Sequence, residues 1–406
     1  MEATKRKRSN GVYLPADLVI EILLKLPVKS IIRFECVAKN WYNLFKNPTF
    51  ISQHSRVSKK NSAASLIFNY YDPKSNSSGY RIGMMMFGDD KTYVSYQDLH
   101  QRLPCHVADK KIRNYEIIVG DGLVCLFDFR RSGQMTLWNP ATKEFRILPF
   151  CNQFTPPIKR PRNSGGRCAR RSTGGGCVVH FLGCGIDPSS NDYKVLFIRQ
   201  ESISFGYWTN SYAIYRMSSN SWTVLKKEEL QLVEDPDLII NDTNLCINGV
   251  CYWHVIVYEP SGRINHELCK LLKFHLDTEV FQLMDSPIPA SFHNGKLMPL
   301  PASGRIAFWE STEDRCGIWV LNDEGNDWTK LINIDVPIGF KGMFGFWTHG
   351  TVFVESSKFG QALMPYDLET GKFNDLEIDT YAFYSYEESL LPVESIKYLQ
   401  CLRSKE

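Results

Sequence analysis

The sequence of 406 residues lacks a long apolar run: nowhere do the roughly 18 consecutive apolar residues that a membrane-spanning helix requires occur. It also lacks a secretory signal, because Asp17 and Glu21 interrupt the apolar stretch that follows the basic residues 5–8. We therefore expect no membrane partner, and a location in the cytoplasm, the nucleus or both.

Enzyme signatures are missing as well. The sequence contains no glycine-rich phosphate loop ending in Lys-Ser or Lys-Thr, no nucleophile elbow, and no pair of histidines flanking a glutamate on a helix. We therefore expect a protein without catalytic residues and without a cofactor.

Cysteine is present, with 12 residues spread along the chain, but without a secretory signal these are interpreted as free thiols. Two groups could in principle supply metal ligands: Cys168, Cys177, His180 and Cys184, and then Cys246, Cys251 and His254. Residues 178–181 and 186–198 fit β-strands, in which adjacent side chains point to opposite faces, and Cys251 and His254 would point to opposite faces of one strand. We therefore expect no metal site, and core or half-buried positions for these side chains.

Net charge is small, at +3, because the basic excess is local. It lies in two blocks: Lys5, Arg6, Lys7 and Arg8, and then Lys159, Arg160, Arg162, Arg167, Arg170 and Arg171. The remainder holds 37 basic and 44 acidic residues. The first block fits a solvated tail or a nuclear-import signal. The second could bind an acidic protein or nucleic acid, although it lacks the interleaved aromatics that stack on bases.

Residues 14–50 have a helical pattern. Leu18, Ile22, Leu23 and Leu26 fall on one helical stripe, which Pro27 ends. Two further short helices fit residues 29–36 and 40–45. Three helices this short cannot bury their own apolar surface. Either the rest of the chain or another protein must cover them.

From about residue 60 onward, short β-type runs alternate with turn residues. One unit recurs five times, and its paired aromatics are Trp138 and Phe145, Tyr215 and Trp222, Phe274 and Phe281, Trp319 and Trp328, and Tyr366 and Phe373. The second aromatic follows the first by seven positions in four units and by nine in the fourth along the chain. This pattern predicts a β-hairpin with the two aromatics as its anchors.

Glycine-led strands precede several of these units, at residues 122–127, 249–253, 304–309 and 350–354. Two strand pairs per unit, with a period of ~45 to 60 residues in the later units, predict a β-propeller of roughly five to seven blades. An irregular β-sandwich is the alternative. Residues 154–177, rich in Pro and Gly, are expected to form a flexible loop that carries the second basic block.

Two segments resemble a known family. Residues 14–50 resemble the F-box through Leu14, Pro15, Leu18, Ile22, Leu23, Leu26, Pro27, Ser30, Ile31, Arg33, Phe34, Cys36, Val37, Lys39 and Trp41. The later region resembles the F-box-associated domain of plant F-box proteins, which include S-locus F-box proteins, through residues 121–125, 137–140, 185–187, 192–195, 221–222 and 248–253. The implied architecture is a small three-helix F-box followed by a mostly-β propeller-like repeat domain.

The resemblance implies a role as the substrate-recognition subunit of a Skp-cullin-F-box E3 ubiquitin ligase. The residues implied to form or support the contact with a Skp-type adaptor are Leu14, Pro15, Leu18, Ile22, Leu26, Pro27, Ile31, Val37 and Trp41. The β domain would hold a protein substrate, for which the basic residues from Lys159 to Arg171 are the candidate contacts. The adaptor would connect the chain to a cullin-RING ligase.

The expected domains are a basic tail (1–11), the F-box (12–54), the propeller-like domain (55–395) and a C-terminal tail (396–406). Within the family, a role of S-locus type in pollen self-incompatibility is one possibility and other regulatory targets are another. The alternative function is a nuclear or nucleic-acid-binding scaffold that acts through the basic segments.

Overall fold

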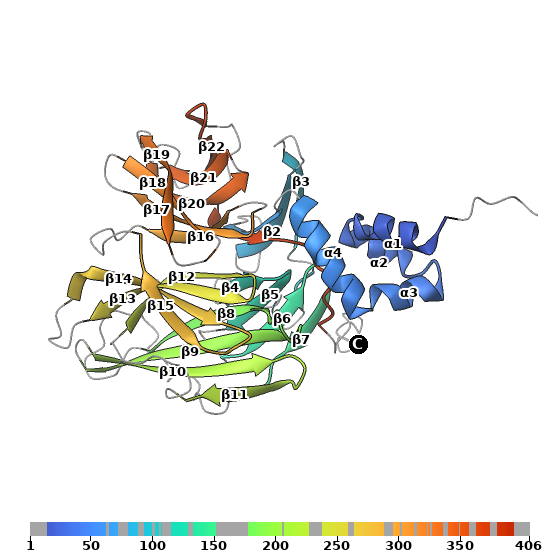
Figure 1. Cartoon of the computed structure of the whole chain (residues 1–406), viewed down its shortest axis with the longest axis horizontal. Coiled ribbons are helices and arrows are strands. Elements are labelled where there is room, and N and C mark those ends of the chain that lie inside the picture. Colours follow the sequence, from blue (N-terminus) through green and yellow to red (C-terminus); the bar gives the residue numbers. More distant parts are fainter. Residues whose placement is uncertain are drawn as a thin grey trace, which may run out of the picture.

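The structure is a computed structural model. It describes residues 14–61, 65–71, 80–87, 93–99, 102–104, 107, 115–128, 133–151, 178–204, 207–226, 238–258, 264–287, 295–300, 303–311, 315–322, 324, 327–335, 340–348, 350–356, 363–373 and 380–393. Within these ranges, four helices precede six four-stranded antiparallel sheets arranged as a β-propeller (Figure 1). No helix in these ranges is long and apolar enough to cross a bilayer.

The helices are α1 (Ala16–Leu24), α2 (Val28–Phe34), α3 (Lys39–Phe45) and α4 (Pro48–Asn61). Pro15 and Pro27 directly precede α1 and α2, where a missing N–H costs no helical hydrogen bond. The three predicted helices are confirmed. A fourth helix, α4, was not predicted; it packs against α1 and α3 and continues past residue 54, the expected end of the helical domain.

The first sheet contains β24 (Thr380–Tyr386), β1 (Ser65–Tyr71), β2 (Tyr80–Phe87) and β3 (Tyr93–Asp98). The second contains β4 (Tyr115–Gly120), β5 (Leu123–Asp128), β6 (Met135–Asn139) and β7 (Glu144–Ile147). The third contains β8 (Val178–Ile186), β9 (Tyr193–Ser204), β10 (Tyr207–Arg216) and β11 (Ser221–Leu225).

The fourth sheet contains β12 (Leu238–Ile247), β13 (Val250–Tyr258), β14 (Ile264–His275) and β15 (Phe281–Asp285). The fifth contains β16 (Lys296–Leu300), β17 (Arg305–Ser311), β18 (Arg315–Leu321) and β19 (Trp328–Asp335). The sixth contains β20 (Phe340–Thr348), β21 (Thr351–Ser356), β22 (Leu363–Asp367) and β23 (Lys372–Phe373).

The ring is closed by strands from the two ends of the propeller. β24 pairs antiparallel with β1, so the first sheet is built from both ends of this domain. The first strand of each later sheet contacts the first strand of the sheet before it, from β24 and β4 round to β16 and β20. Apolar clusters fill the spaces between neighbouring sheets; one joins the third sheet to the fourth through Ile214 and Trp253. The predicted propeller is confirmed, with six blades.

The predicted hairpin unit is confirmed in four of its five copies. The facing pairs are Trp138 and Phe145, Tyr215 and Trp222, Phe274 and Phe281, and Tyr366 and Phe373. In each, the residue two positions before the second aromatic has a positive φ, from 49° to 67°. The turn therefore has the same backbone shape in all four.

The remaining copy, the fourth along the chain, differs, and its predicted pairing of Trp319 with Trp328 is wrong. Trp319 faces Lys330, while Trp328 faces Leu321. The turn of residues 322–327 is two residues longer than the turn of residues 140–143, and this moves the second tryptophan out of position. The Lys330 ammonium instead lies 4.9 Å from the centre of the Trp319 ring, a cation–π contact.

One expectation about cysteine is also wrong. Cys246 and Cys251 form a disulfide, although all cysteines were expected to be free thiols. The two residues face each other across β12 and β13, with Cα atoms 4.1 Å apart, because the two-residue Asn248-Gly249 turn sets this register. The free cysteines among the described residues include Cys125, Cys184 and Cys316, all buried.

Candidate functional site

The helical segment has a small core of its own. Its buried members are Leu23, Val28, Ile31, Phe45, Phe50, Ile51 and Leu390. All but one come from the helices. Leu390 comes from the far end of the chain, which joins the helical segment to the propeller.

A row of large apolar side chains stays outside this core. Leu14, Leu18 and Ile22 are 50%, 46% and 52% exposed; Leu18 and Ile22, four residues apart, lie on one side of α1, and Leu14 directly precedes Pro15 at the start of this helix. Val37, between α2 and α3, is 62% exposed. A row of exposed apolar side chains of this kind is typical of a surface that binds another protein.

The residues implied to contact an adaptor fall into two groups. On the surface are Leu14, Pro15, Leu18, Ile22, Pro27 and Val37. Leu26 and Trp41 are half-buried against the helical core, and Ile31 is fully buried. The last three can only support the surface from beneath. Tyr42 was not among the expected residues, although it is 48% exposed on α3, the helix that also carries the buried Phe45. The helical periodicity of α3 could have placed it on the exposed side.

His54 ties α4 to the end of α1. Its Nε2–H donates to the carbonyl of Leu26 at 2.8 Å, and its side chain is buried next to Phe50. Burial lowers the pKa of His54, although the hydrogen bond to Leu26 acts in the opposite direction. The imidazole is therefore a structural link that is held neutral.

The helical segment joins the propeller through the second sheet. The turn between β6 and β7 brings Ala141 against the helical core. Residues 387–393, which follow β24 and which we name the strap, cross this turn and bring Leu390 into the same core. Figure 1 shows this red C-terminal segment passing between the helices and the second sheet.

Residues 185–195, part of the pattern that resembles the F-box-associated domain, form a buried ion cluster. The Lys194 ammonium contacts Asp187 at 2.9 Å and Glu279 at 2.8 Å, and it donates to the Leu276 carbonyl at 2.6 Å. Glu279 also pairs with Arg216. Burial alone would raise the pKa of Asp187, but hydrogen bonds from Ser190, Lys194 and Ser189 hold it well below its usual value. The cluster joins the third and fourth sheets, so these residues act in the fold.

The candidate metal ligands do not come together in the described part of the chain. His180 packs against the rings of Phe127 and Phe197, with centroids 5.4 and 5.2 Å away. Cys184 is fully buried, and burial raises its pKa to about 12. No group of three or more His, Cys, Asp or Glu among the described residues could hold a metal ion. Cys168 and Cys177 lie outside those residues, as do both basic blocks.

Comparison with known families agrees with this architecture. Residues 13–53 match the F-box domain, and residues 74–386 match the F-box associated beta propeller domain. The chain belongs to the F-box-associated beta propeller family. It thus combines the two parts of an F-box substrate receptor: an F-box, which is the domain that binds Skp-type adaptors, and a propeller.

Its relatives include proteins of Arabidopsis thaliana. F-box protein At5g18160 is 28% identical over 78% of this chain and 69% of its own length. F-box protein At1g47810 is 26% identical over 89% of this chain and 98% of its own length. Among solved structures, the six-bladed fungal lectin aleuria aurantia lectin aligns with a TM-score of 0.36 and 9% identity, covering 78% of this chain and 96% of the lectin. That likeness is too distant to inform the choice of ligand.

Proposed function

We propose that this protein is the substrate-recognition subunit of a Skp-cullin-F-box E3 ubiquitin ligase and contributes no catalytic residue itself. The F-box would bind a Skp-type adaptor, and the propeller would hold a protein substrate near the ubiquitin-charged enzyme. A location in the cytoplasm or nucleus accompanies this role.

The observation that carries the proposal is the exposed row on α1. The helices possess a core, yet Leu14, Leu18 and Ile22 remain about half exposed on one side of it. Taking a side chain of this size from full exposure to full burial contributes about 1.5–3 kcal/mol, so covering the exposed half contributes roughly half of that. A partner helix or sheet that covers the row would therefore gain a few kcal/mol from these three side chains.

The proposal is tested by placing a charge in the row. Leu18→Asp and Ile22→Asp should each weaken adaptor binding, measured by calorimetry, by at least about 30-fold, the equivalent of 2 kcal/mol at an interface hot spot. Leu331→Asp is the matched control, since Leu331 is a leucine 58% exposed on β19 in the propeller. Equal affinity for all three variants and the parent would refute the assignment.

For the substrate, we propose a protein with an acidic surface. The support is the charge of the second basic block, from Lys159 to Arg171. The described residues nearest to it are Cys151, which follows β7, and Val178, which begins β8. Because β7 starts at the turn that contacts the helices, its far end, from which the chain continues to Cys151, points away from the F-box. Neutralising its six cations should abolish capture of the substrate but leave adaptor binding unchanged. If the block instead binds nucleic acid, a polyanion column will retain the chain with a steep salt dependence.

A further inference from the structure

Asn139, at the end of β6, is fully buried and uses all of its hydrogen-bonding capacity. Its Oδ1 accepts from the backbone N–H groups of Ala141 at 2.9 Å and Thr142 at 3.2 Å. Its Nδ2 donates to the strap, to the carbonyl of Ser389 at 3.0 Å and that of Leu391 at 2.9 Å. One side chain thus shapes the turn and holds the strap.

The sixth sheet separates these two roles. Asp367 follows Tyr366 there, as Asn139 follows Trp138, and its Oδ1 accepts from the N–H groups of Glu369 at 3.1 Å and Thr370 at 2.8 Å. A carboxylate is therefore sufficient to shape this turn. It cannot donate, so the two donations of Asn139 are specific to the sheet that the strap crosses.

The strap is closely fitted along its length. Val393 is buried in the core between the second and third sheets, and its N–H donates to Glu144 Oε2 at 3.2 Å. The Leu391 N–H donates to Ser389 Oγ at 3.0 Å. At the neighbouring turn, a Cβ on Gly122 would collide with Ser389, so only glycine permits the strap to pass there.

Leu390 is directed away from the propeller, into the F-box core. It is 7% exposed and packs in one cluster with Leu23, Phe45 and Phe50. The carbonyls on either side of it, those of Ser389 and Leu391, are the two that Asn139 holds. The amide therefore fixes the short piece of backbone from which Leu390 enters the F-box.

We propose that the strap sets the orientation of the F-box on the propeller and that Asn139 is its positioning residue. Because β24 closes the ring immediately before the strap, the strap starts from a strand that is fixed by its pairing with β1. The consequence rests on the proposed function: a substrate bound to the propeller would be presented to the ligase at one fixed angle, with its lysines within reach of the charged enzyme.

The decisive variant is Asn139→Asp. It keeps the acceptor that the turn needs, as Asp367 shows, but replaces both donations by a carboxylate facing two carbonyl oxygens. Asp367→Asn is the matched control, because it makes the reverse change in a turn that the strap does not cross. Leu390→Ala is a second variant, which leaves the turn itself unchanged.

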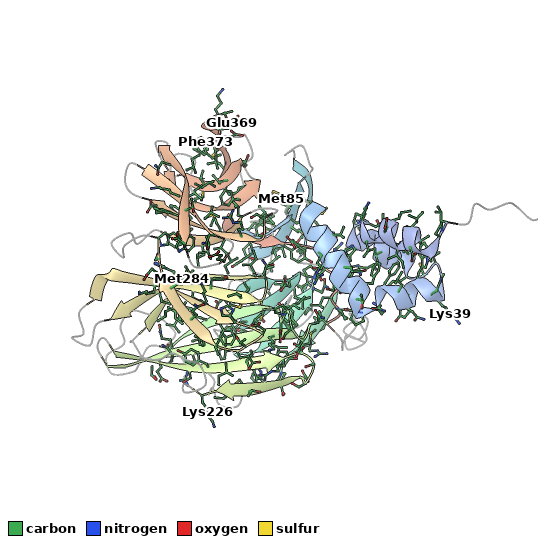
Figure 2. All side chains as sticks on the ribbon, in the orientation of Figure 1. Lys39, Met85, Lys226, Met284, Glu369 and Phe373 are labelled. Atoms are coloured by element: carbon green, nitrogen blue, oxygen red, sulfur yellow. A yellow bond between two sulfur atoms is a disulfide. The ribbon has the colours of Figure 1, made fainter. Side chains whose placement is uncertain are left out.

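The measurement is the distance distribution between genetically encoded spin labels at residues 39 and 226 in the full chain. Figure 2 shows Lys39 on the helical segment and Lys226 on the propeller, and both are exposed. The parent and Asp367→Asn should give one narrow distribution; Asn139→Asp and Leu390→Ala should give a broad one. Adaptor affinity should stay within about twofold in Asn139→Asp and Asp367→Asn, since neither side chain belongs to the helical core that supports the row on α1.

A narrow distribution with the parent's mean in Asn139→Asp would overturn the proposal. If Asn139→Asp does not fold, Leu390→Ala provides the test. A narrow distance distribution with the parent's mean in this variant, with a propeller of normal thermal stability, would overturn the proposal. A parent chain that does not bind the adaptor would instead refute the proposed function. The distance measurement on the free chain would still test whether the strap sets the orientation of the F-box.

Discussion

At the scale of single residues, buried charges hold neighbouring blades together. Lys194 and Asp187 are 5% and 2% exposed, so their mutual attraction is screened less than that of a surface pair. Each charge has several partners, which offsets the cost of removing it from water. Removing one member leaves the others buried without compensation.

Lys194→Met should therefore lower the free energy of unfolding by about 3–5 kcal/mol. Denaturant titration followed by tryptophan fluorescence measures it. The matched control is Lys270→Met, which breaks the exposed pair of Lys270 with Asp285 and should cost about 0–1 kcal/mol. Similar losses in the two variants would show that the buried cluster stabilises the fold no more than an exposed ion pair does.

His254 should make stability depend on pH. It is 4% exposed, and both ring nitrogens lack a hydrogen-bond partner among the described residues. Burial lowers its pKa to about 4, against about 6.5 in an unfolded chain. Its protonation thus favours unfolding, so stability should be full above about pH 6.5 and fall as the pH drops toward 4.

His254→Leu should flatten this fall, while the part that arises from His54 remains. The change also removes an unpartnered buried polar group, so stability at pH 7 should be unchanged or higher. Thermal melts of both proteins from pH 4 to 7.5 provide the measurement. A parallel pH profile in the variant would contradict the assignment.

At the scale of the element, the hairpin turn is set by one left-handed residue. Lys143, Asn220, Glu279 and Gly371 hold this position in the four regular units. The spacing of seven between aromatics predicts these hairpins, because it leaves room for one turn shape only. The same reasoning fails for Trp319 and Trp328, where the turn is two residues longer. It also misses α4, although Asn47 and Pro48 mark the start of this helix, because most of its later residues are polar.

Gly371→Ala should cost about 1–2 kcal/mol of stability, because an L-residue at φ +67° is strained. The new Cβ would meet only the Tyr366 hydroxyl, at 3.5 Å, so crowding adds little. Thermal denaturation measures the loss. Lys372→Ala, one residue along and exposed, is the control that should change little; an equal effect in both would argue against backbone strain.

At the scale of the whole molecule, closure of the ring depends on the last described strand. Leu66 on β1 faces Ser385 on β24, a pairing between the two ends of the propeller. A repeat period cannot reveal such a contact, nor the strap, because neither recurs along the chain. The helical pattern predicted one stripe of Leu18, Ile22, Leu23 and Leu26, but the structure divides it: Leu18 and Ile22 are exposed, whereas Leu23 is buried in a core that Leu390 helps to form.

A chain ended after Asp379 should lose cooperative unfolding, since it lacks both the inner strand of the first sheet and the strap. A chain ended after Val393 keeps both and is the matched control. Calorimetry distinguishes them: the shorter chain should show a broad, weak transition. A sharp transition at the same temperature in both would mean that β24 does not close the ring.

The central claim is that the exposed side of the F-box is completed by a Skp-type adaptor. Amide hydrogen exchange along the chain, with and without a saturating adaptor, tests it directly. The account predicts slower exchange confined to residues 14–45, with the strands of the propeller unchanged. Identical exchange in residues 14–45 with and without the adaptor would contradict it.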